Sequence, residues 1–142
     1  MLSVKELQAK IALAESAKAS QALKAQQAED AAKAELFDRL SKPSGMSDDE
    51  IMAKANIVIS RAAENGLMSV QVFRFPNHLC TDNGRAINQQ EPGWEKTLTG
   101  HGKEIHEFWK RRLEPLGYRI GYSITDYPGG MPGDVRITLR WD

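Results

Sequence analysis

Residues 3–42 contain neither glycine nor proline, and they are rich in Ala, Lys, Glu and Gln, which are strong helix formers. Ser3 and Glu6 have the spacing of a capping box, which marks the beginning of a helix. The next residues, Lys-Pro-Ser-Gly, end the pattern, because Pro and Gly stop helices. The sequence therefore predicts one long N-terminal helix over residues 1–42, followed by a linker at 43–46.

A helix of this length is too long to be covered by its own domain. About forty residues give a helix of roughly 60 Å, whereas the remaining hundred residues form a compact domain only about 35 Å across. The large apolar residues gather at the two ends of the helix. We expect the C-terminal end to pack on the domain and the N-terminal end to bind a second copy or another protein. The expected contact residues at the N-terminal end are Leu2, Val4, Leu7, Ile11 and Ala14.

A solvated single helix is the alternative to a partnered one. Val4, Leu7, Ile11 and Ala14 have heptad-like spacing, but the repeat fades after two heptads, whereas a sustained coiled coil needs three or four. High Ala content and ion pairs between residues four apart would stabilise a helix that has no partner. The sequence leaves both interpretations open.

Residues 47–142 have the mixed pattern of a small domain. Ser47 and Glu50 form a second capping box in front of an apolar stripe, which predicts a core helix of about seventeen residues. A strand follows over 67–75, where the apolar residues change phase, so that either both faces are buried or a bulge intervenes. Another helix is expected over 102–113, carrying its apolar residues on one face.

The stretch from Tyr118 to Trp141 alternates apolar and polar residues on both sides of a Pro/Gly-rich break, as in a β-hairpin. We therefore predict an α+β fold: a small three-stranded, mainly antiparallel sheet with helices packed on one face, plus the long projecting helix. The break is long for strands this regular. It exposes Tyr127 and Met131 for protein contact unless it folds back onto the irregular segment 76–99.

The polar side of the hairpin carries three arginines, Arg119, Arg136 and Arg140. A basic sheet face can bind nucleic acid, but such sheets usually expose aromatic side chains for base stacking. Here the Tyr and Trp residues belong to the opposite side. A solvated face whose charges prevent edge pairing explains the arginines better, and nucleic-acid contact is kept as a second hypothesis.

No group of residues has the pattern of a catalytic or metal site. Cys80 and His78 are a candidate nucleophile and base, although a lone Cys is usually a small apolar core residue. The Gly100–Lys103 stretch lacks the lead residues and the Ser/Thr of a phosphate-binding loop. Residues of metal-binding types match no known ligand spacing: His78, Cys80, Asp82, His101 and His106. We expect no metal, cofactor or catalytic residue, and a small enzyme is the third hypothesis.

Composition narrows the remaining classes of function. The chain carries 19 basic and 19 acidic residues, so no net charge attracts nucleic acid or an anionic membrane. Its one cysteine allows no internal disulfide, which fits a reducing compartment. No apolar run reaches the roughly 18 residues of a membrane span. We expect a non-enzymatic, cytoplasmic protein that assembles through its N-terminal helix, or a component of a larger particle assembled inside the cell.

Overall fold

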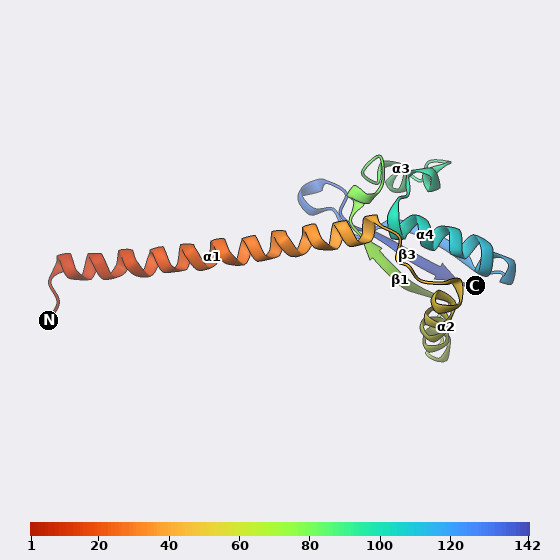
Figure 1. Cartoon of the computed structure of the whole chain (residues 1–142), viewed down its shortest axis with the longest axis horizontal. Helices are drawn as coiled ribbons and strands as arrows, with labels where there is room; N and C mark the ends of the chain where they lie inside the picture. Colours follow the sequence, from red (N-terminus) through yellow and green to blue (C-terminus); the bar gives the residue numbers. More distant parts are fainter. The chain divides into compact units, whose positions relative to one another are not determined.

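The computed structural model describes all residues, 1–142. They form two compact units, Met1–Leu36 and Phe37–Asp142. The first unit consists of most of α1 (Val4–Ser41), a single continuous helix (Figure 1). The second unit contains the end of α1 and the α+β domain, because Leu40 is buried in the core of that domain.

The predicted long helix is confirmed, together with its beginning. Ser3 Oγ accepts a hydrogen bond from the Glu6 amide at 3.1 Å, and the Glu6 carboxylate accepts one from the Ser3 amide at 3.3 Å. Ion pairs between residues four apart form at Glu29–Lys33, at 3.3 Å, and near the end of the helix. None of the helices of this protein has both the length and the apolar character that a membrane crossing requires.

The sheet of the second unit has three strands, β1 (Ser69–Phe75), β2 (Arg119–Ile124) and β3 (Val135–Arg140). Their order is β1-β3-β2, and both neighbouring pairs are antiparallel. This confirms the predicted hairpin and places its second strand at the centre of the sheet. The apolar side chains of the central strand are buried: Val135, Ile137 and Leu139.

The change of phase expected in the first strand is a β-bulge. Gln71 lies opposite Thr138 and Phe73 lies opposite Ile137, so that Val72 is an extra residue in β1. Val72 and Phe73 are both partly buried against the core. The bulge thus allows two consecutive side chains to reach the apolar face of the sheet.

The main helices cover this apolar face, as predicted. The first of them, α2 (Asp48–Glu64), begins at Ser47, whose Oγ accepts a hydrogen bond from the Glu50 amide at 3.2 Å. The other, α4 (Gly100–Phe108), continues as a π-helical turn over Trp109–Leu113. One core cluster joins both helices to the central strand through Ile59, Phe108, Leu113 and Leu139.

The irregular segment 76–99 is packed into the core. It contains the short helix α3 (Arg85–Asn88) and two 3-10 turns. Leu98 is buried and Trp94 is half-buried, so both residues hold the segment on the domain. The segment also buries Leu79, Cys80 and Ile87 in the same cluster as the sheet. It is therefore a structural part of the domain.

Two glycines at the start of α4 are required by close packing. A Cβ on Gly100, whose φ is +55°, would lie 2.0 Å from the carbonyl oxygen of Leu40. A Cβ on Gly102 would lie 3.1 Å from the ring of Phe75. The glycines thus permit the end of α1 and the first strand to approach α4 closely, which accounts for them without any phosphate-binding role.

Candidate functional site

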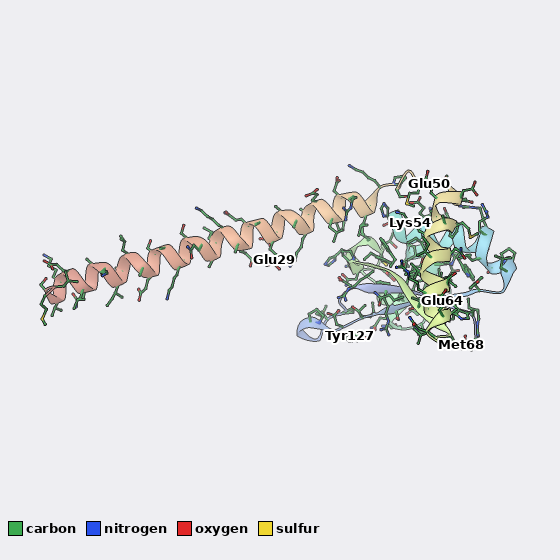
Figure 2. The ribbon with its side chains drawn as sticks, turned by 90° about the horizontal axis from the view of Figure 1, so that it is seen from below. Glu29, Glu50, Lys54, Glu64, Met68 and Tyr127 are labelled. Atoms are coloured by element: carbon green, nitrogen blue, oxygen red, sulfur yellow. The ribbon has the colours of Figure 1, made fainter.

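The apolar side chains of α1 in the first unit are uncovered. Val4 is 71% exposed, Leu7 45% and Ile11 56%, and Ala14 is exposed as well. Leu2, also exposed, precedes the first helical residue. Figure 2 shows the side chains of α1 standing away from the helix along its length, with Glu29 labelled. All five expected contact residues are therefore exposed.

An apolar groove lies in the second unit, between α2 and α4 and over the sheet. Its volume is about 410 Å³, which is within the range of ligand-binding clefts. Val72, Phe73 and Leu139 of the sheet line it. The helix walls are formed by Ile51, Ala55 and Val58 of α2 and by Ile105, Phe108, Trp109 and Leu113 on the other side.

The sequence did not predict this groove. The stripe of α2 was assigned to the core, but only its last turns are buried, at Ile59 and Ala62. Val58 is 37% exposed and Ala55 is only partly covered. The signal for a groove was the small residue, Ala55, in the middle of the stripe, because a small side chain leaves space between two helices.

Polar contacts hold the two walls of the groove together. In the linker, Ser44 donates from its hydroxyl and its amide to the two carboxylate oxygens of Glu104, at 2.6 and 3.0 Å. At the beginning of α2, Asp48 pairs with Arg111 at 3.0 Å and lies 3.8 Å from Arg112. The hydrogen bond from Arg111 lowers the pKa of Asp48. These hydrogen bonds and ion pairs thus hold the linker and the beginning of α2 in place at the edge of the groove.

The three predicted arginines lie together on the open face of the sheet and are exposed. Asp142 accepts hydrogen bonds from Arg119 at 2.9 Å and from Arg140 at 3.1 Å. Arg140, the larger influence, and Arg119 lower the pKa of Asp142. Arg136 donates to Ser123 Oγ at 2.8 Å. Two of the three arginines, Arg119 and Arg140, are therefore paired with the same carboxylate, that of Asp142.

The hairpin tip is both attached and exposed. The Tyr127 hydroxyl donates to the Asn88 side chain, and Asn77 Nδ2 donates to the Pro132 carbonyl at 2.9 Å, which ties the tip to segment 76–99. Even so, Tyr127 is 54% exposed and Met131 69%, and Figure 2 labels Tyr127 at the tip. The tip is therefore attached to segment 76–99 while the side chains of Tyr127 and Met131 stay exposed.

Cys80 is unsuited to nucleophilic chemistry. Its side chain is buried, and burial raises the pKa of the thiol to about 11. His78 is exposed and lies next to Asn83, with 3.4 Å between Nδ1 and Oδ1. His106 packs among aromatic rings that include Trp94. No group of three or more His, Cys, Asp or Glu side chains lies close enough together to hold a metal ion.

Comparisons with protein families, with curated proteins and with solved structures found no match to this chain.

The surfaces described above differ in whether other residues of the protein already bind or cover their side chains. The arginine face and the hairpin tip make hydrogen bonds within the domain. The large apolar side chains of α1 in the first unit are exposed, and the apolar groove between α2 and α4 is open.

Proposed function

We propose that this protein is a non-enzymatic interaction protein that assembles through α1, with copies of itself or with another protein. One observation carries the proposal: the unit Met1–Leu36 buries none of its residues, although large apolar side chains lie along it. In proteins, most helical stability comes from packing of an apolar face. A partner on α1 would supply that packing.

The domain would give such an assembly a binding surface. Its groove is apolar and open, and the hairpin tip exposes Tyr127 and Met131, residue types that suit protein contacts. The single, buried thiol of Cys80 suits a reducing compartment. We therefore propose that the protein acts in the cytoplasm or within a larger particle assembled there.

Light scattering after size-exclusion chromatography tests the proposal on the full chain. At tens of micromolar, we expect a mass above the 15.8 kDa of one chain, or a stable complex with a partner purified from the same cells. The double variant L7K/I11K should lose the assembly, because two charges would enter its apolar face. The matched control is L13K, since Leu13 is 76% exposed and lies on another side of the helix.

Two results would contradict the proposal. One is a wild-type chain that has the monomer mass and captures no partner. The other is an assembly that L7K/I11K leaves intact. A loss of assembly in L13K as well as in L7K/I11K would show that added charge alone causes the effect. Circular dichroism of each variant shows whether the helix is still formed.

Nucleic-acid binding is the second candidate function. It is supported by the exposure of Arg119, Arg136 and Arg140 on one sheet face. It is weakened by the Asp142 carboxylate between two of them and by a face without aromatic residues for stacking. Salt-dependent binding of a labelled oligonucleotide that is lost on charge reversal at all three arginines would favour this function. Binding that persists in that variant would exclude the arginine face.

A further inference from the structure

One side of α1 carries apolar residues interrupted by charges of alternating sign. With 3.6 residues per turn, an arc of about 100° contains the apolar residues Ile11, Ala22, Ala25 and Leu36, and such an arc is the width of a packing face. Four charged residues share this arc, in the order Glu15, Lys18, Glu29 and Lys33. All eight side chains are exposed in the structure.

The pattern is nearly symmetric about the middle of the helix, so that apolar and charged positions recur at the same distances from the centre toward either end. Lys18 and Glu29 are equally far from the midpoint between residues 23 and 24, and so are Ile11 and Leu36. Ala22 and Ala25 lie on either side of the same midpoint. Glu15 and Lys33 are related in the same way to within one residue. A helix with this property has opposite charges, and matching apolar residues, at equivalent distances from its centre.

We propose that α1 binds a second copy of itself in the antiparallel direction, with the midpoint of residues 23 and 24 on the two-fold axis. The inference rests on the proposed function and names the partner that α1 would bind. Lys18 then faces the partner's Glu29, and Glu15 lies beside the partner's Lys33. Ile11 meets the partner's Leu36, and Ala22 meets the partner's Ala25. Each contact occurs twice, because a two-fold axis relates the copies.

The charges decide the direction of the pair. In a parallel pair in register, Lys18 would face the partner's Lys18, and each of the other three charged residues would also face its own copy. Like charges at such positions oppose pairing and select against it. In the antiparallel pair, every charge of the face meets an opposite one. The two alanines next to the axis allow the helices to approach closely, since interaxial distance depends on the side chains at the crossing.

The charges of the face are available for pairing. Within one chain, Glu29 lies 3.3 Å from Lys33, and their side chains are 59% and 70% exposed. An exposed ion pair of this kind contributes little, so it does not prevent Glu29 from facing Lys18 of another copy. No ion pair within the chain involves Glu15 or Lys18.

Disulfide cross-linking tests the direction on the full chain. The variants I11C and L36C are prepared separately, mixed and oxidised, at a concentration where light scattering shows assembly. The natural Cys80 is only 2% exposed, so the introduced cysteine is the reactive one. We expect the mixed sample to form an I11C–L36C dimer. Neither variant alone should cross-link, because its two cysteines would be about 37 Å apart at 1.5 Å per residue.

Each other outcome overturns the antiparallel pair. Cross-linking of I11C alone shows a parallel pair, which leaves self-assembly through α1 intact. Assembly without cross-links in any sample shows that another surface is used, which also contradicts the proposed function. If the protein is a monomer that binds a different protein through Leu7 and Ile11, pairing of α1 with a second copy is ruled out, whereas the proposed function is supported.

Charge reversal provides a second, independent measurement. We expect K18E and E29K each to weaken self-association roughly two- to thirtyfold, since each replaces two pairs of opposite charges across the axis by two pairs of like charges. The double variant K18E/E29K should restore it, because the swap recreates both opposite pairs. The matched control is K24E, on another side of the helix, which should have no effect. A double variant as weak as the single ones would overturn the proposal.

Discussion

Gly100 shows how a single residue sets the distance between two helices. Its φ of +55° and the Leu40 carbonyl, 2.0 Å from where a Cβ would be, leave no space for a side chain. The sequence alone showed only that the stretch from Gly100 lacks the pattern of a phosphate-binding loop. The contact could not be predicted, because the residues involved are sixty positions apart.

Substitution of this glycine should destabilise the domain. We expect Gly100→Ala to lower the free energy of unfolding by about 1–3 kcal/mol, since the Cβ forces the backbone of α1 away from α4. Urea unfolding measures the change. The control is Gly121→Ala in β2, where a Cβ meets nothing within 4 Å and where we expect little change. Equal effects at the two positions would contradict the close contact.

His106 should make the stability of the domain depend on pH. Burial among Trp94, Trp109 and Tyr122 lowers its pKa from 6.5, and nearby charges contribute less. The folded protein therefore favours the neutral ring. The stability from this residue is fully present above the unfolded pKa of about 6.5 and is lost as pH falls through the lower, folded pKa.

Unfolding by urea at a series of pH values measures this effect. The wild-type protein should lose stability as the pH falls below about 6.5, and His106→Phe should lose less, because Phe keeps the aromatic packing without a proton to bind. If His106→Phe and the wild type have the same pH dependence, burial of His106 has no role in it.

At the scale of the elements, the groove between α2 and α4 depends on the small side chain of Ala55. Ala55→Leu places a larger apolar side chain into the open volume of about 410 Å³. We expect it to raise the free energy of unfolding by roughly 1 kcal/mol, the order expected for burying additional methylene groups. It should also reduce binding of an apolar fluorescent dye.

The control is Ala53→Leu on the exposed side of the same helix. It adds the same atoms to α2 without entering the groove, so it should leave dye binding unchanged. Dye fluorescence and thermal unfolding are measured for both variants. Stronger dye binding in Ala55→Leu than in the wild type would show that the groove is not the binding place.

The helices and strands that could be predicted from the sequence are those marked by patterns among residues close together in the chain. Ser47 caps α2 through a hydrogen bond to a residue three positions away, and the hairpin follows from the alternation of Val135, Ile137 and Leu139 with polar residues. The position of β3 between β1 and β2 has no such signal. Either strand of the hairpin can pair with β1, and packing against the helices decides between them.

Some features of the candidate sites could likewise be predicted from the sequence, and others could not. Exposure of Val4, Leu7 and Ile11 followed from the mismatch between the lengths of helix and domain. The groove did not, because it depends on how far α2 stands from α4 in space. The partner of Arg119 and Arg140 was also missed, since Asp142 joins two strands that only the register brings together.

At the scale of the whole molecule, the boundary between the two units lies inside α1. We expect the fragment 37–142 to be as stable as the full chain, because it keeps the buried Leu40. The fragment 43–142 should lose about 2–5 kcal/mol, the usual cost of removing a buried leucine side chain. Thermal and urea unfolding of both fragments measure this difference. Equal stability of the fragments would show that Leu40 contributes nothing to the core.

The bulge in β1 has a consequence for aggregation. A three-stranded sheet has two edges, and β1 forms one of them. A regular, flat edge offers unpaired N–H and C=O groups to strands of other molecules. The extra residue at Val72 interrupts that spacing and increases the local twist, so a foreign strand cannot pair along the full length of β1. The bulge therefore makes disordered association through the β1 edge of the sheet less favourable.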